Sequence, residues 1–186
     1  MHVRIIALTA VVIGAAAVSG FADQSPFTAA RRAELLRSAL SAAPSSIAAH
    51  ATVMAPGPDG KMVTLQKGSN GFTCFPDDPG TPGPDPVCAD AAAMKWNDDY
   101  SAHASRPTNT VPGIMYMLAG GSDASNTDPY AKAGPKTKWV TSGAHWMLMW
   151  PMDPKTSGFG TTPKRTGSYI MWAGTPWAHL MVNQIP

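Results

Sequence analysis

Glutamate is almost absent from this chain of 186 residues, because Glu34 is the only one. The other acidic residues are all aspartates, which favour turns and helix caps over helix interiors. Charged residues make up only 14% of the chain, which also contains 18 prolines and 17 glycines. This composition predicts a loop-rich protein of strands and turns with little helix.

The sequence motifs of several common enzyme classes are also missing. The chain has no G-x-S-x-G elbow, no HExxH zinc motif, no P-loop and no dinucleotide-binding fingerprint. Its formal net charge of +2 is too small to indicate a nucleic-acid-binding protein or a polybasic membrane-binding patch. We therefore expect no nucleic-acid partner, and the sequence alone names no reaction.

The first 22 residues have the layout of a secretory signal peptide. A short basic start precedes an apolar run from Ile5 to Val18, and the small residues Gly20 and Ala22 suit cleavage before Asp23. The run is too short to span a bilayer comfortably, and no cysteine follows it that could carry a lipid. We expect a periplasmic or secreted protein with no stable membrane anchor after cleavage; an uncleaved anchor is the alternative.

The rest of the chain is expected to form an N-terminal helical segment, 23–46, and a single β-rich domain, 47–186. The stretch from Ser25 to Pro44 predicts one helix, with Ser25 as its cap, and ADAAAMKWNDDYSAH predicts a second. Short apolar and alternating stretches between turn signals predict strands, including KMVTLQ, IMYML, WMLMWP and YIMWAGTPWAHLMV. The predicted fold class is α+β: a mainly antiparallel sheet with one or two helices, loop-rich, whose last two strands are in contact.

The chain has two cysteines, Cys74 and Cys88, which predict one disulfide in an exported protein. The loop between them, FPDDPGTPGPDPV, is rich in proline and aspartate. Closing a loop of about 15 residues stabilises a fold by roughly 3 kcal/mol in the chain-entropy model. Prolines already restrict the unfolded loop, so the stabilisation is expected to be smaller than this figure.

This loop, together with MYMLAGGSDASNTDPYA and MWAGTPWAHLM, resembles a family of short, uncharacterised exported bacterial proteins. The resemblance covers the chain from about Met62 to its end. It implies a periplasmic or secreted location. No activity comes with it, and it assigns no catalytic residue.

The two stretches GAHWMLMW and WAHLMV share the pattern Ala-His-x-Met. Alternate side chains of a strand face the same way, so each histidine would share a face with its methionine. Imidazole and thioether are ligands that suit copper, especially Cu(I), outside the cytoplasm. The sequence therefore indicates a small binding domain with a soft-metal site, copper being the best-argued ion. The candidate ligands are His145, Met147, His179 and Met181, with His50 as a fifth.

Two other interpretations stay open. In one, the protein is structural and both stretches are core strands, since methionine fills cores and packs on tryptophan. In the other, it is a small enzyme in which His145 or His179 acts as acid or base. Asp123 or Asp128, from the polar loop 120–130, would then orient the imidazole, and Trp177 would shape a ligand pocket. A metal site requires these histidines and methionines to converge, whereas the structural interpretation requires buried imidazoles and no pocket.

Overall fold

The structure, a computed structural model, describes residues 26–184. The expected signal peptide, its cleavage site before Asp23 and the expected helix cap Ser25 lie outside the described residues. Of the helices within 26–184, none is both long enough and apolar enough to cross a bilayer.

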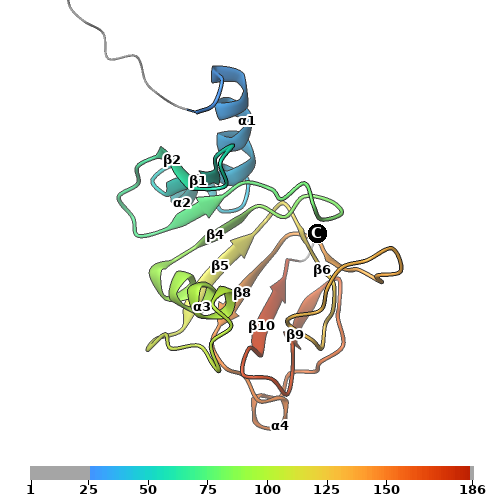
Figure 1. The fold of residues 1–186 in the computed structure, drawn as a ribbon. Helices are drawn as coiled ribbons and strands as arrows, with labels where there is room; N and C mark the ends of the chain where they lie inside the picture. The colour runs from blue at the N-terminus through green and yellow to red at the C-terminus, as the bar shows by residue number, and fades with distance from the viewer. Residues whose placement is uncertain (1–25, 185–186) are drawn as a thin grey trace, which may run out of the picture.

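The centre of the fold is an eight-stranded sheet with the strand order β2-β1-β3-β4-β5-β8-β10-β9 (Figure 1). Every neighbouring pair is antiparallel except β1 and β3, which run parallel. β6 and β7 form a separate two-stranded sheet. The strands are β1 (Thr52–Pro56), β2 (Met62–Gln66), β3 (Thr73–Phe75), β4 (Val87–Ala89), β5 (Gly113–Met117), β6 (Gly121–Asp123), β7 (Val140–Ser142), β8 (His145–Met149), β9 (Gly167–Met171) and β10 (His179–Asn183). The predicted α+β class with a mainly antiparallel sheet is confirmed.

Four helices accompany the sheet within residues 26–184: α1 (Ala29–Leu40), α2 (Ser45–Ala48), α3 (Ala91–Ser101) and α4 (Pro154–Ser157). α1 is shorter than predicted, because Thr28 caps its start and Pro44 begins α2 instead of ending α1. α3 lies where predicted, and the carboxylate of Asp90 accepts a hydrogen bond from the backbone N–H of Ala93 at 2.8 Å.

The two long helices cover opposite faces of the sheet. Successive residues of a strand point to opposite sides, and β4 shows which helix covers each side. Cys88 packs with Leu35 and Ala39 of α1, whereas its neighbour Ala89 packs with Trp96 of α3. In Figure 1, α3 crosses in front of β4 and β5, while α1 stands at the β1–β2 end of the sheet.

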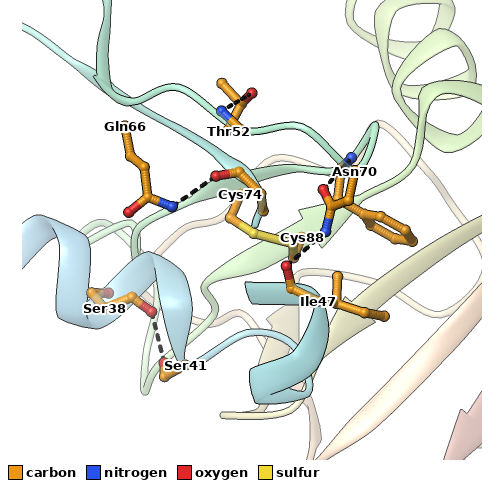
Figure 2. Close-up of a disulfide and its surroundings, with 11 residues drawn as sticks. Ser38, Ser41, Ile47, Thr52, Gln66, Asn70, Cys74 and Cys88 are labelled. Atoms are coloured by element: carbon orange, nitrogen blue, oxygen red, sulfur yellow. Dashed lines mark hydrogen bonds between the residues drawn. A yellow bond between two sulfur atoms is a disulfide. The ribbon is translucent and has the colours of Figure 1, made fainter. Parts of the chain in front are cut away.

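The predicted disulfide is confirmed: Cys74 and Cys88 are bonded, and they occupy directly paired positions of β3 and β4 (Figure 2). Both cysteines are fully buried on the α1 side of the sheet. Nearby amide side chains tie the chain to the same region, since Gln66 donates to the Ala51 carbonyl and Asn70 to the Ile47 carbonyl. The bridge therefore fixes the start of the proline-rich loop to its end.

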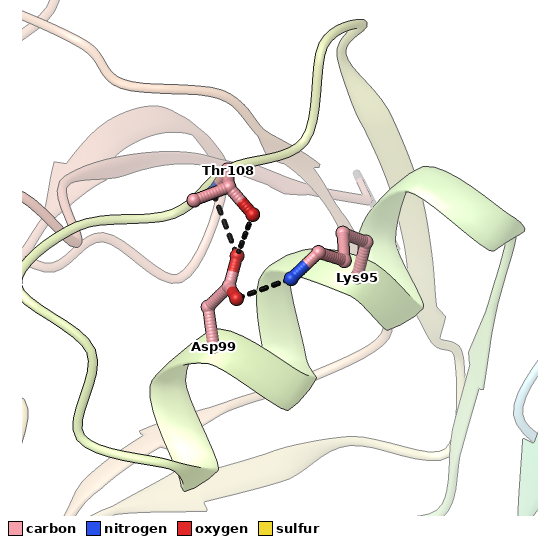
Figure 3. Close-up of polar contacts among 3 residues, drawn as sticks. All are labelled: Lys95, Asp99 and Thr108. Carbon is pink, nitrogen blue, oxygen red and sulfur yellow. Dashed lines mark hydrogen bonds and ion pairs between the residues drawn. The ribbon is translucent and has the colours of Figure 1, made fainter.

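α3 is tied to the loop that follows it through Asp99 (Figure 3). One carboxylate oxygen accepts hydrogen bonds from the backbone N–H and the hydroxyl of Thr108, each at 2.7 Å, and the other pairs with Lys95. The hydrogen bond from Lys95 and those from Thr108 lower the pKa of Asp99. This contact holds α3 in place over the sheet.

Candidate functional site

The face of the sheet under α3, called here the α3 face, carries both histidines of the Ala-His-x-Met stretches. β8 is the central strand of this arrangement, since it pairs with β5 on one side and with β10 on the other. Met147 of β8 pairs with Met115 and with Met181, which gives a row of three thioethers across three strands. The side chains of this face are Met115 and Met117 (β5), His145, Met147 and Met149 (β8), His179 and Met181 (β10), and Tyr169 and Met171 (β9).

The two histidines share this face without being neighbours. His145 pairs with Asn183, which lies four residues beyond His179 on β10. At about 3.4 Å per residue, this offset separates the two backbone positions by roughly 14 Å along the strands. The imidazoles are still close enough that a charge on His145 contributes to lowering the pKa of His179. The register therefore places His145 and His179 on the same face of the sheet, on opposite sides of the row of three methionines.

A cavity of about 230 Å³ lies between the α3 face and the groups that cover it. One histidine, His179, lines it; His145 and Met181 are not among the lining residues. The wall combines thioethers, aromatic rings and acidic groups: Met115, Met117, Met147, Met149, Met171, His179, Val87, Trp96, Tyr100, Trp172, Asn97, Ser122, Asp85 and Asp123. The cavity has a histidine end (Met149, Met171 and His179) and an acid end (Asp85, Met117, Ser122 and Asp123).

At the histidine end, His179 is 2% exposed and its Nδ1 lies 3.0 Å from the carbonyl of Trp177. Because a carbonyl only accepts, Nδ1 carries the proton and Nε2 keeps its lone pair. Within residues 26–184 no hydrogen bond reaches Nε2. Burial lowers the pKa of His179 to about 4, so the ring is neutral at physiological pH.

His145 has the same local arrangement and is equally buried. Its Nδ1 lies 2.8 Å from the carbonyl of Gly143, and burial lowers its pKa. β6 passes directly over the ring at Gly121, where a Cβ atom would lie 3.1 Å from Cε1 of His145 and 2.9 Å from Cε of Met117. Glycine at this position therefore allows β6 to approach the sheet closely.

The acid end joins Asp123 of β6 with Asp85 of the proline-rich loop. The side chain of Asp123 is half-buried and has no hydrogen bond or ion pair within the described part of the chain. Burial, together with the nearby charge of Asp85, raises the pKa of Asp123 to about 6. Asp85 accepts hydrogen bonds from the backbone N–H of Asp78 and the hydroxyl of Thr81, and burial raises its pKa as well.

Aromatic rings form the wall over the cavity. Trp96 stacks on Tyr100 and on Trp172 with ring centroids 5.6 Å and 6.2 Å apart, and it meets His179 edge-on at 5.6 Å. Trp177, a candidate ligand-binding residue, is 3% exposed and packs edge-on against Trp96 at 5.1 Å. It therefore supports the wall from behind. The Nε1 atom of Trp96 is buried and has no hydrogen-bond partner among residues 26–184.

Two other candidate residues lie away from the cavity. His50 is exposed and precedes β1, which is four strands from β8, or roughly 19 Å at the usual strand spacing. Asp128 is exposed and accepts a hydrogen bond from the backbone N–H of Tyr130, which is the turn role typical of aspartate. The structure does not bring either residue to the α3 face.

Sequence reasoning missed several residues of the cavity, above all Met171, Trp172, Tyr100 and Asp85. Met171 pairs with His179 across β9 and β10, a relation that depends on strand register. Within residues 26–184 no three His, Cys, Asp or Glu side chains are grouped so that they could hold a metal ion. The donors that line the cavity are one imidazole, several thioethers and two carboxylates.

The chain thus forms an α+β domain with a methionine-lined cavity on one face of its sheet. Comparison with protein-family models, with curated proteins and with solved structures gives no match.

Proposed function

We propose that the protein is a small exported binding domain for a soft metal ion, Cu(I), held at the histidine end of the cavity. The ligands are Nε2 of His179 and the thioethers of Met149 and Met171, with Met147 as a further donor. The observation that carries the proposal is the neutral His179, whose Nε2 lone pair is unused within residues 26–184, in a cavity lined by methionines.

The register supports this ligand set. Met171 is the direct partner of His179 on β9, and Met149 lies one step beyond the last described pair of β8 and β10, Leu180 with Leu148. Both thioethers therefore flank the imidazole on the same face. Methionine is flexible, so its sulfur can move toward an ion without a change in the backbone. Thioether and imidazole donors select Cu(I) over hard cations.

The hydrogen bond at Nδ1 also suits a metal ligand. Ligating histidines usually donate their other ring N–H to a carbonyl or carboxylate, which fixes the tautomer and the ring orientation. The Trp177 carbonyl has this role for His179. No lysine or arginine is among the described residues that line the cavity, and Asp85 and Asp123 give it a negative charge. This charge favours a cation.

The ligand set differs from the one that the sequence pattern favours. His145 and Met181 share the α3 face but do not line the cavity, and His145 is covered by Gly121. An acid–base role for either histidine has less support, because Nδ1 of each faces a backbone carbonyl and no carboxylate. A histidine with a pKa of about 4 is also a weak base near neutral pH.

The test is a Cu(I) titration of the mature chain without oxygen, in competition with a coloured Cu(I) chelator. We expect about one bound ion per chain. His179→Asn and Met171→Leu should each weaken binding by roughly tenfold or more, as expected for the loss of a ligand. Met62→Leu is the matched control, because Met62 is 46% exposed on β2 and far from the cavity. Absence of binding, or equal binding by all four proteins, would overturn the proposal.

A further inference from the structure

We infer that the acid end of the cavity is a binding site, and that its ligand is a small primary ammonium ion with a short apolar body. Asp123 takes the ammonium group, Asp85 adds a second carboxylate, and the rings and thioethers beside them surround the apolar part. This inference does not depend on the copper proposal, since its ligand contacts lie at the opposite end of the cavity from the proposed copper ligands. Asp85 and Asp123 contribute only their charge to the copper proposal.

Asp123 is the residue from which the inference starts. Its side chain is half-buried at the cavity and has neither a hydrogen bond nor an ion pair within residues 26–184. The described ion pairs of the chain are Arg31–Glu34, Lys61–Asp59 and Lys95–Asp99, all elsewhere. A carboxylate that loses part of its hydration is stabilised by a cation or by hydrogen-bond donors. The described residues supply neither at Asp123, so a ligand cation suits this position.

Asp85 makes the site doubly acidic. It lines the same cavity, and its charge is one of the two causes that raise the pKa of Asp123. The oxygens of Asp85 already accept hydrogen bonds from Asp78 and Thr81, which hold the carboxylate in place and leave further lone pairs. An ammonium group has three N–H donors, and charge-assisted hydrogen bonds to carboxylates are among the strongest in proteins.

The remaining wall fits an apolar body and limits its size. Met117 belongs to the acid end itself, and the cavity wall also includes Val87 and the ring of Tyr100, which is stacked between Tyr130 and Trp172. The cavity volume of about 230 Å³ is below the usual range for drug-sized ligands. A short amine fits this volume. The unpaired Nε1 of Trp96 is a donor that a ligand oxygen at the other end of the amine can use.

A hard metal ion is a poorer match for the same carboxylates. Calcium takes six to eight oxygen ligands, and magnesium requires a near-octahedral set. The acid end offers two carboxylates and the Ser122 hydroxyl, which donates to the Pro82 carbonyl, beside apolar side chains. Carboxylates beside apolar walls suit a cation that carries its own apolar part.

The experiment compares 2-phenylethylamine with 2-phenylethanol, which has nearly the same shape and no charge. Binding to the mature chain is followed by calorimetry at pH 7.5 and by tryptophan fluorescence. We expect the amine to bind and the alcohol to bind at least tenfold more weakly, the size expected for the loss of a charge-assisted hydrogen bond. Amine affinity should fall below pH 6, where protonation of Asp123 removes the negative charge. Equal binding of amine and alcohol, or no amine binding, overturns the inference.

Variants separate this site from the copper site. Asp123→Asn should lose amine binding by roughly tenfold or more and keep most of its Cu(I) affinity. His179→Asn should lose Cu(I) binding and keep most of its affinity for the amine. Asp128→Asn is the matched control, because Asp128 is an exposed aspartate that does not line the cavity. Amine binding that survives in Asp123→Asn contradicts the inference; if that variant does not fold, the amine–alcohol comparison and the pH dependence of the unchanged chain decide.

Discussion

His179 should make the fold sensitive to mild acid. The ring is 2% exposed, and burial lowers its pKa to about 4, compared with an ordinary value of 6.5. The unfolded chain therefore binds a proton near pH 6.5, whereas the folded chain does so only near pH 4. Between these values the unfolded state binds more protons, so the free energy of unfolding falls as the pH is lowered. The loss begins below pH 6.5 and is complete near pH 4.

The size of this effect follows from the two pKa values of His179. Their difference corresponds to roughly 3 kcal/mol at 1.36 kcal/mol per pKa unit, of which about 2 kcal/mol is lost between pH 7 and pH 5. Asp123 acts in the opposite direction, because its pKa of about 6 lies above the ordinary value of 3.8. Protonation of this carboxyl regains about 1 kcal/mol over the same interval. The contribution of His179 must therefore be measured as a difference between variants.

The assay is urea unfolding followed by tryptophan fluorescence at pH 7 and at pH 5. The variant is His179→Asn, whose side-chain amide can still donate to the Trp177 carbonyl but does not titrate. The free-energy gap between the native chain and this variant should shrink by about 2 kcal/mol on going from pH 7 to pH 5. His50→Asn, at an exposed position, is the control and should follow the native chain. If the native chain and His179→Asn lose the same free energy of unfolding, the reasoning about His179 is refuted.

Two further predictions concern stability. Replacing Cys74 and Cys88 with serine should lower the free energy of unfolding by about 2 to 3 kcal/mol, and the prolines of the loop favour the smaller figure. Urea unfolding of the variant and of the native chain measures this difference. An unchanged urea midpoint would contradict the prediction. Gly113→Ala should be strongly destabilising, because its Cβ would lie 2.2 Å from a backbone nitrogen of α3. Gly134→Ala is the control, since no atom lies within 4 Å of its Cβ, and equal thermal midpoints for the two alanine variants would refute the packing argument.

Much of the fold could be predicted from local sequence signals. Asp90 before an alanine-rich stretch marks the start of α3, and the alternation in KMVTLQ matches β2, where Leu65 is buried and Met62 exposed. β6 was not predicted, since Gly121–Asp123 is a short polar segment with no apolar alternation. It forms a strand because it pairs with β7 and packs over His145, and these contacts are tertiary.

The candidate site could be predicted only in part. Strand alternation correctly places His145 with Met147, and His179 with Met181, on one face. The alternation within one strand does not determine its register with the neighbouring strands. This register pairs His145 with Asn183 and His179 with Met171. Asp85 reaches the cavity through the disulfide-bridged loop, which has no periodic pattern. The sequence could therefore predict a histidine–methionine face but not which of its side chains line a cavity.

The position of β10 has a consequence for the biogenesis of the protein. This strand comes last in the described chain but lies between β8 and β9, so the ribosome makes His179 after almost every other residue around it. Until then, β8 and β9 present unpaired edges, which are prone to pair with other chains. A cell that makes this chain must keep it from aggregating until its final segment has been synthesised. Chains cut short before residue 179 should accumulate as aggregates or be degraded.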